Sequence, residues 1–470
     1  MSLTTLALGE VRRPSRVLPM AAVALALGTM VATLPPLYGA ALFGAALVLP
    51  VVFARPVLGL CLALLTIPLS TEWSVGLGGL NLTLMEPAVA LAAVAWLWRG
   101  ARERSLRIWP SALLAAQLLV LALFVAAALG AEMLAPSLKD TLKWLELVIV
   151  FVLTLDQARD PGAARLVLAS LLIAGALEAA YGAFQFVTGR GPPFFAIGPF
   201  MRAFGHFNQP NPFAGYLATA LPIALALAFL RRDPVTRWAR PAAVLIGASI
   251  VLSLSRGAWL GVALACGIML AAASPRTRRL LVPLAAALLL LFSLASLGVL
   301  PAVLADRLGI VAEYFGPFDV RRAEVTPENW AIVERMAHWQ AAWDMFRDHP
   351  WLGVGPGNYA TAYEEYFLPG WLEPLGHAHN YYLNLAAETG VVGLAGYLLV
   401  LALGFRAAVQ GLAARTAFWR AVALGVLGSL VAITLHSAFD NLYVHGVSVQ
   451  IGVLLALGQI AADQRSAAGG

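Results

Sequence analysis

Long apolar stretches recur along the chain from Val17 to the C-terminal region, separated by short polar turns. Most are close to the ~20 residues that a helix needs to cross a bilayer. Because their apolar residues are continuous and do not alternate with polar ones, they predict membrane helices and not the strands of a barrel. We expect fourteen spans, at about 17–34, 37–54, 57–70, 83–98, 110–130, 139–156, 164–187, 212–230, 241–255, 257–273, 280–299, 380–403, 418–437 and 445–462.

One polar segment, at about residues 301–376, interrupts this pattern and predicts a single large loop outside the membrane. A helix is expected in it from Glu328 to Arg347, with Pro327 in the first turn, because apolar residues recur at helical spacing: Ile332, Met336, Trp339, Trp343 and Phe346. Asp348-His349-Pro350 should end this helix, and Gly353 to Tyr359 should form a tight turn. These glycines do not indicate a nucleotide site, because no strand precedes them and no Gly-Lys-Ser follows.

The expected architecture is an all-α polytopic membrane protein with roughly 12–14 transmembrane helices. Residues 1–300 would hold the first eleven spans, residues 301–379 the large loop with its helices, and residues 380–470 the C-terminal spans. The composition agrees, because 60% of the residues are hydrophobic and only 12% are charged, and the mean hydropathy is +0.80. A soluble domain has about twice that charged fraction.

The distribution of charge orients the spans. With the N- and C-termini in the cytoplasm, most of the 31 lysines and arginines fall in cytoplasmic segments, as the positive-inside rule requires. The net charge of +6 is therefore a topology signal and does not indicate a nucleic-acid partner. Arg190, Arg202 and Arg256 break the rule in short outer loops, and all 7 histidines also lie on the outer side. Cys61 and Cys266 lie in apolar stretches and indicate neither a disulfide nor a metal site.

Polar residues gather at the outer ends of several spans. The segment Met201 to Pro212 carries Arg202, His206 and Asn211 where the eighth span begins. An arginine beside a helix N-terminus is suited to bind an anion, because free backbone N–H groups and the helix dipole attract negative charge. Arg256 lies in a short outer turn, and a planar guanidinium can donate two parallel hydrogen bonds to a phosphate. The alternative for both arginines is a salt bridge or snorkelling to lipid headgroups.

A third polar cluster lies at the mouth of the twelfth span. His377 and His379 stand one residue apart there. Histidine is the side chain that changes charge near neutral pH, and a neutral imidazole can take a proton from a hydroxyl, so a general base is the favoured interpretation of His379. Two histidines at this spacing could also ligate zinc, but no third ligand stands out and no metal is expected.

The residues that follow extend this cluster toward the membrane. If a helix begins near Asn380, then Asn380, Asn384 and Glu388 share one face, since they are four residues apart. They would form a polar stripe that descends from His379 into the bilayer. The alternative is that Asn380 caps the helix and that Asn384 and Glu388 make hydrogen bonds between helices. Tyr381 belongs to the same cluster.

Here the chain resembles the O-antigen ligase and Wzy-type O-antigen polymerase superfamily. The resemblance lies in His379-Asn380 followed after nine residues by Gly-x-x-Gly at Gly390 to Gly393, in Ser-Arg-Gly at 255–257, in the 202–212 region and in the turn at 353–359. It implies a GT-C-like, metal-independent glycosyltransferase without a cofactor, in the bacterial inner membrane with its active site facing the periplasm. The donor would be a glycan on undecaprenyl diphosphate. The acceptor would be lipid A–core for a ligase, or another lipid-linked repeat for a polymerase.

The resemblance also implies roles for the clustered residues. His379 would be the acceptor base, and Arg202 and Arg256 would hold the donor diphosphate. Supporting residues would be His377, Asn380, Tyr381, Asn384, His206 and Asn211. Two other functions stay open: an exopolysaccharide polymerase, and a transporter or flippase, for which charges in broken helices near the middle of the membrane would be evidence.

Overall fold

The structure, a computed structural model, describes residues 36–77, 80–230, 233–297, 299, 320–322, 324–326 and 329–465. The span expected at 17–34, and Pro327, lie outside these residues. The chain divides into two compact units, Met1–Arg55 and Pro56–Gly470. The first contains helix α2 (Pro36–Ala54), and the candidate site lies entirely in the second.

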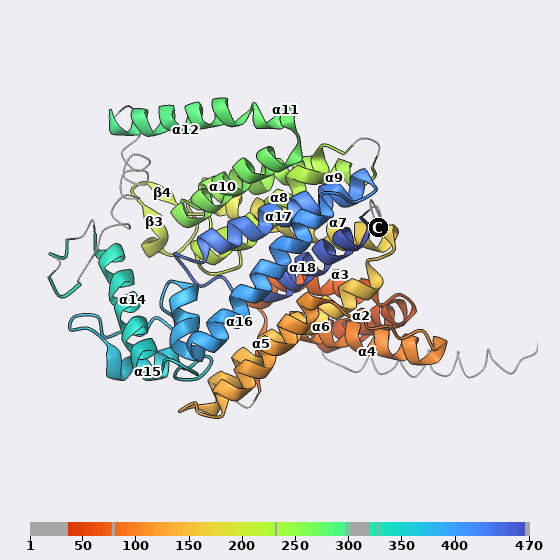
Figure 1. The fold of residues 1–470 in the computed structure, drawn as a ribbon, viewed down its shortest axis with the longest axis horizontal. Coiled ribbons are helices and arrows are strands. Elements are labelled where there is room, and N and C mark those ends of the chain that lie inside the picture. The colour runs from red at the N-terminus through yellow and green to blue at the C-terminus, as the bar shows by residue number, and fades with distance from the viewer. Residues whose placement is uncertain are drawn as a thin grey trace, which may run out of the picture. The chain divides into compact units, whose positions relative to one another are not determined.

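Apolar helices make up most of the second unit (Figure 1). They are α3 (Val57–Thr66), α4 (Met85–Glu103), α5 (Ala112–Ala128), α6 (Leu134–Gln157), α7 (Pro161–Thr188), α8 (Pro210–Ala228), α9 (Thr236–Leu252), α10 (Arg256–Ala273), α12 (Leu281–Ser296), α16 (Tyr381–Gly411), α17 (Ala417–His436) and α18 (Val447–Asp463). In the described part of the chain, α7, α8, α10, α16 and α17 are long and apolar enough to cross a membrane by themselves. The prediction of an all-α multi-pass membrane protein is confirmed.

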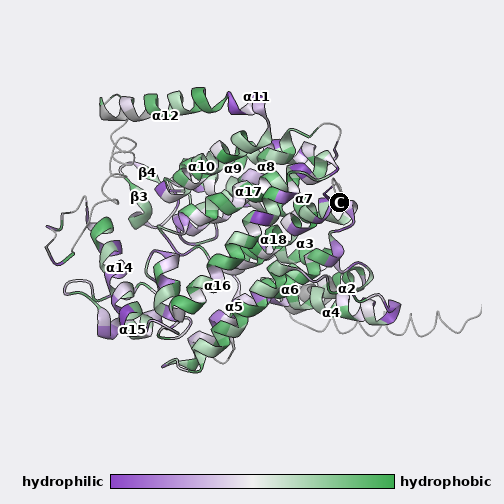
Figure 2. Cartoon of the chain, viewed as in Figure 1, coloured by the Kyte–Doolittle hydropathy of each residue, from purple (hydrophilic) through white to green (hydrophobic). Residues whose placement is uncertain are grey.

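The polar helices lie in the loop that precedes α16. Helix α14 (Trp330–Asp348) matches the predicted helix, ends where the Asp-His-Pro sequence was expected to end it, and is followed by α15 (Tyr359–Tyr366). Figure 2 shows more hydrophilic residues on these two helices than on the apolar bundle. Their core contains Tyr359, Tyr363 and Met345, and it also includes Ala378, the residue between the two histidines. The histidine loop is therefore packed into the core of the outer segment.

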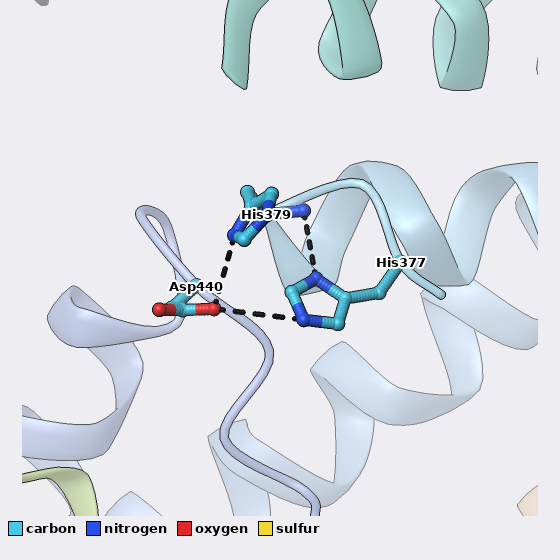
Figure 3. Close-up of side chains that lie close together, drawn as sticks. All are labelled: His377, His379 and Asp440. Carbon is cyan, nitrogen blue, oxygen red and sulfur yellow. Dashed lines mark hydrogen bonds and ion pairs between the residues drawn. The ribbon is translucent and has the colours of Figure 1, made fainter. Parts of the chain in front are cut away.

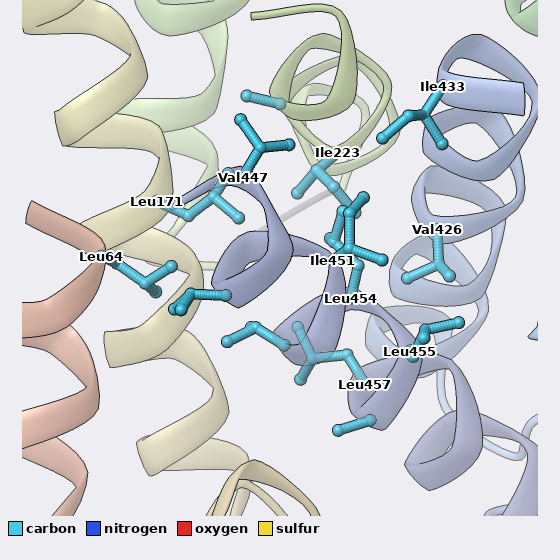
Figure 4. Packing of buried hydrophobic residues seen from close by; sticks show 14 of the residues in the cluster. Leu64, Leu171, Ile223, Val426, Ile433, Val447, Ile451, Leu454, Leu455 and Leu457 are labelled. Carbon is cyan, nitrogen blue, oxygen red and sulfur yellow. The ribbon is translucent and has the colours of Figure 1, made fainter. Parts of the chain in front are cut away.

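Helix α18 lies at the centre of the apolar core. Its residues Val447, Ile451 and Leu454 are almost fully buried. Figure 4 shows them beside Leu64 of α3, Leu171 of α7, Ile223 of α8 and Val426 and Ile433 of α17. Such interior packing is sensitive to changes of even one methylene. This packing therefore fixes the positions of both ends of the loop between α17 and α18.

Helix α16 is broken at Gly390, where φ is 65° and ψ is −168°. The predicted glycine turn fills the break: the N–H groups of Val354 and Gly355 donate to the carbonyls of Ala387 and Glu388, and the N–H of Val391 donates to the carbonyl of Pro350. A Cβ on Gly390 would lie 2.1 Å from the carbonyl oxygen of Trp351, so only glycine fits. The continuous span expected at 380–403 is thus two helical pieces held by the outer segment.

Two short antiparallel hairpins were not expected from the sequence. Strands β1 (Ser74–Leu77) and β2 (Leu80–Thr83) precede α4, and strands β3 (Ala196–Ile197) and β4 (Phe200–Met201) precede the segment that carries Arg202. Strands this short have too few alternating positions to be recognised by period.

Candidate active site

The two histidines sit on a loop whose shape is set by its neighbours. The amide oxygen of Asn384 accepts a hydrogen bond from the N–H of Ala378, and the side chain of Asn380 caps α16 by accepting from the next two free N–H groups. The indole of Trp339 on α14 donates to the carbonyl of His379. His379 itself has φ of 50°, a backbone conformation that costs a non-glycine residue of order 1–3 kcal/mol and is common at functional sites.

Asp440, in the loop between α17 and α18, faces both histidines (Figure 3). Its Oδ1 lies 3.4 Å from Nδ1 of His379 and 3.9 Å from Nε2 of His377, and both distances are longer than a short hydrogen bond. The Nδ1 of His377 accepts a 3.0 Å hydrogen bond from the backbone N–H of His379. A neutral His377 therefore carries its proton on Nε2, toward the carboxylate.

The other contacts of Asp440 lead to the first cluster of polar residues. Its Oδ2 accepts a 2.8 Å hydrogen bond from the side-chain amide of Asn211, at the start of α8. The Oδ1 of Asn211 accepts in turn from a terminal nitrogen of Arg202, at 3.0 Å, and from the hydroxyl of Ser255, also at 3.0 Å. Nε of Arg202 donates to the carbonyl of Ser253. One hydrogen-bonded chain thus joins three segments that lie far apart in the sequence.

Arg256 is the first residue of α10, directly after Ser255. Its neighbour Gly257 packs against the ring of His436, because a Cβ there would lie 2.5 Å from the ring carbon Cδ2. The hydroxyl of Ser255 binds the same Asn211 that binds Arg202. The structure therefore connects the Ser-Arg-Gly turn to the Arg202 segment through one amide.

The ionisable residues of this cluster differ in the direction and cause of their pKa shifts. Burial alone would raise the pKa of the Asp440 carboxyl, but the contact with His379 and the nearby positive charges, including that of Arg335, hold that pKa well below its usual range. Burial, together with the charge of His379, lowers the pKa of His377 to about 4. Burial and the charges of His379 and His377 lower the pKa of His338 to about 3. Near neutral pH, Asp440 is thus a carboxylate beside neutral His377 and His338.

His206 has a separate partner. Its Nδ1 lies 2.8 Å from Oε2 of Glu178, its backbone N–H donates to Oε1 of the same carboxylate, and its ring stacks on Tyr181. The hydrogen bond with Glu178 raises the pKa of His206, although burial opposes the shift. Gly205 lies so close to Glu178 that any side chain there would overlap it. This pair holds the segment that carries Arg202.

The remaining residues of the predicted site have structural contacts. Tyr381 stacks on Tyr443 and packs edge-on against Tyr397, which ties the start of α16 to the Asp440 loop. The carboxylate of Glu388 accepts from the N–H of Tyr359 and so caps α15. Together with the contacts of Asn380 and Asn384, this supports the capping alternative over a polar stripe leading into the membrane.

Sequence reasoning missed Asp440, Ser255 and Arg335 as members of the cluster. Asp440 is the only acidic residue between α17 and α18, and it lies between His436 and His445, two of the outer histidines. An acid in that setting was a usable signal. Arg335 lies on α14, for which the sequence predicted only an apolar packing face.

The three atoms offered by His377, His379 and Asp440 lie within 4.8 Å of one another, a spacing at which a metal ion could be held. Two of the three residues also have hydrogen-bond partners in the structure: the carboxylate accepts from Asn211 and from the N–H of Asn441, and His377 accepts from a backbone N–H. Nδ1 of His379 is buried and makes no hydrogen bond to the described residues. The residues present are chemically suited both to bind a metal ion and to bind one another through hydrogen bonds.

A known protein family matches part of the chain. Residues 241–398 match the family model Wzy_C, described as O-antigen ligase. The matched residues include Arg256, His377 and His379, and they end before Asp440; Arg202 lies before them. No curated protein matches the chain. The resemblance seen in the sequence is confirmed for this segment, and the structure joins it to residues on either side.

Proposed function

Because residues 241–398 carry an O-antigen ligase domain, we propose that the protein transfers a glycan from a polyprenyl diphosphate, undecaprenyl diphosphate in bacteria, to an acceptor hydroxyl on the periplasmic face of the inner membrane. The observation that carries the proposal is the hydrogen-bonded chain from Arg202 through Asn211 to Asp440, which faces His379. It links a cationic group suited to phosphate with an imidazole suited to take a proton.

His379 is the proposed base. Its Nδ1 faces the carboxylate of Asp440 at 3.4 Å, which favours the tautomer with the proton on Nδ1. The lone pair of Nε2 then accepts the proton of the acceptor hydroxyl. As that oxygen bonds to the anomeric carbon, the bond from this carbon to the diphosphate oxygen breaks, and its electron pair leaves with the diphosphate. Asp440 stabilises the imidazolium that forms, as the carboxylate does in the Ser-His-Asp arrangement of proteases.

Arg202 and Arg256 are the proposed diphosphate ligands. Arg256 begins α10, where the first backbone N–H groups and the helix dipole add to the attraction of the guanidinium for an anion. Arg202 is oriented by Ser253 and Asn211, so its planar fork is held in one direction before a substrate arrives. Negative charge that develops on the leaving diphosphate is then met by groups already in place.

The acceptor distinguishes the candidates within this class. Lipid A–core makes the protein an O-antigen ligase, which we take as the leading function. A second lipid-linked repeat makes it a Wzy-type or exopolysaccharide polymerase. A transporter or flippase is disfavoured because the described charges of the cluster lie at the ends of spans, where Arg202, Asn211 and Asp440 are joined to one another.

The central test is transfer by purified protein in lipid vesicles, with a lipid-linked glycan as donor and lipid A–core or a second lipid-linked glycan as acceptor. His379→Ala should lower kcat by about 10²–10⁴-fold, the usual contribution of a general base. His349→Ala serves as the matched control, since His349 directly follows α14 and is not in contact with Asp440. Near-normal turnover by His379→Ala would show that the base is another group, and uptake without a glycosidic product would favour a transporter.

A second test addresses the leaving group and the proposed independence from metal. Arg256→Lys keeps the charge but removes the planar fork, so the KM for the donor should rise by about tenfold or more. Unchanged donor affinity would contradict diphosphate binding through that fork. Transfer in excess EDTA should equal transfer without it; a loss restored by a divalent cation would instead assign the His377–His379–Asp440 atoms to a metal.

A further inference from the structure

A polar cavity of about 450 Å³ lies in the same unit as the site. Small-ligand sites usually have about 300–1,000 Å³. Its walls come from the β1–β2 hairpin, the start of α4, the outer part of α6 and two loop segments, 207–209 and 443–446. These loop segments directly precede Asn211 and follow Asp440 in the chain, so the cavity and the active site share two loops.

One face of α6 lines this cavity. Lys139, Lys143 and Glu146 are spaced by four and three residues and therefore project from the same side of the helix. Glu86, at the start of α4, and His445 contribute two more ionisable side chains. Ionisable residues on apolar helices are costly and usually mark a functional path. Three of them along one helix face at a cavity require an explanation beyond packing.

The partners of these side chains differ. Lys143 pairs with Asp140 at 2.5 Å, and Glu86 accepts a 2.7 Å hydrogen bond from the N–H of Thr83. Lys139 and Glu146 have neither a hydrogen bond nor an ion pair within the part of the chain that the structure describes. Glu146 interacts electrostatically with Lys143, and Lys139 with His445, but neither side chain is held in place by a hydrogen bond to a described residue.

The charge of the lining argues against a phosphate as occupant. Two lysines are balanced by two glutamates, whereas the active site holds Arg202 and Arg256 against the single carboxylate Asp440. Around the ionisable groups stand neutral donors and acceptors, among them the side chains of Asn81, Asn208, Gln209 and Ser448. A lining that mixes hydrogen-bond donors and acceptors matches the hydroxyl groups of a sugar.

A smaller pocket extends the lining toward the reaction centre. It shares Lys143, Tyr443 and Ser448 with the cavity and reaches Tyr381 and Asn441. The N–H of Asn441 donates to Asp440. Polar lining therefore continues from the cavity to the residue beside the proposed catalytic carboxylate.

We propose that this cavity binds sugar rings of the lipid-linked glycan, with Glu146 and Lys139 as ligands of sugar hydroxyls. The inference rests on the proposed function, and the sugar can belong either to the donor or to the acceptor. Kinetics separate the two sources. Glu146→Gln and Lys139→Gln should each raise the KM for one of the two substrates by about tenfold, the loss of a hydrogen bond to a charged group, with kcat within about twofold. Glu132→Gln, at an exposed position just before α6, is the matched control and should change neither constant.

Protection from labelling tests the same site without turnover. In a background with Cys61→Ser and Cys266→Ser, Ser74→Cys places a thiol on the exposed hairpin that lines the cavity, and Ser105→Cys places one on an exposed loop outside its lining. Undecaprenyl-diphosphate-linked glycan should slow maleimide labelling at position 74 by about fivefold or more at saturation, and leave position 105 unchanged. Undecaprenyl diphosphate without sugar should give no protection.

The outcomes are distinct. Protection by the sugar-free lipid would assign the cavity to the diphosphate and overturn the inference. Unchanged KM values together with no protection by the glycan would also overturn it, while leaving transfer by His379 intact. If instead His379→Ala retains turnover but glycan still protects position 74, the proposed base fails and the sugar site stands.

Discussion

Among the described residues, Glu178 and Asp440 each face a histidine ring, and the two arrangements are built differently. In the first, both oxygens of Glu178 are occupied by His206 itself, one through the ring and one through the backbone N–H. In the second, the oxygens of Asp440 are shared among His379, His377 and Asn211. Glu178 therefore binds a single residue and fixes its loop. Asp440 instead contacts residues from several segments of the chain.

This contrast shows that a histidine beside a carboxylate does not by itself identify a base. Glu178 raises the pKa of His206, so this ring holds its proton more tightly than a free imidazole does. The carboxylate that faces His379 is instead drawn on by an amide and a second imidazole. A ring that faces such a shared carboxylate through one nitrogen can accept a proton at the other.

The largest expected effect comes from removing the negative charge of Asp440. Asp440→Asn should lower kcat by about 10²–10⁴-fold, because an amide can stabilise neither the required tautomer nor the imidazolium. Single-turnover transfer at saturating donor and acceptor measures this. If Asp440→Asn kept more than about a third of normal turnover, the two pairs would be functionally equivalent.

Asn211 tests whether the shared carboxylate must be linked to the arginine. Asn211→Ala removes the amide that joins Arg202 and Ser255 to Asp440, so kcat/KM for the donor should fall by about tenfold, near the value of one hydrogen bond to a charged group. Initial rates at varied donor concentration give the constant. An unchanged kcat/KM would mean that the hydrogen bonds between Arg202 and Asp440 do not contribute to use of the donor.

Glu178→Gln should affect stability more than chemistry. Loss of one member of a buried ion pair costs about 3–5 kcal/mol, and Glu178 is almost fully buried, so the thermal midpoint in detergent should drop clearly. Turnover below that midpoint should stay within about threefold of normal. A change in kcat like that of Asp440→Asn, without loss of stability, would give Glu178 a catalytic role.

The smallest expected effect is on the pH dependence of stability. The raised pKa of His206 means that its pair with Glu178 contributes fully below the ordinary value of 6.5 and is lost as the pH rises through the folded-state value. The pKa of about 3 for His338 has the opposite sign, because the unfolded chain takes up the proton first as the pH falls below 6.5. His338 alone should therefore lower the free energy of unfolding by up to about 1.4 kcal/mol per pH unit on the acid side, and His377, whose pKa is lowered to about 4, adds to the same fall.

Equilibrium unfolding of the two single variants separates these terms. His338→Gln should flatten the acid side of the profile, and His206→Gln should flatten the neutral-to-alkaline side. If each variant instead shifted the whole profile by a constant amount, the two histidines would have unperturbed pKa values in the folded protein.

Much of the local structure was predictable because it depends on neighbours in sequence. Continuous apolar residues determine membrane helices, Pro210 begins α8, and Asn380 caps α16. The glycines at 353–357 and Gly390 were visible as a turn and a motif. The sequence did not show why glycine is needed at these positions. The structure does, because the backbone of the turn enters the break in α16.

By itself, the sequence determined a multi-pass helical membrane protein, because hydropathy acts over short stretches of chain. It also predicted arginines and histidines on one side of the membrane, from the distribution of charge between the spans. Only the tertiary structure decided which of these groups meet. Asp440 is separated from Asn211 by 229 positions, and it reaches both that amide and the two histidines because α17 packs against α8, α16 and α18. Contacts across such separations depend on packing of the whole core, which no local pattern contains.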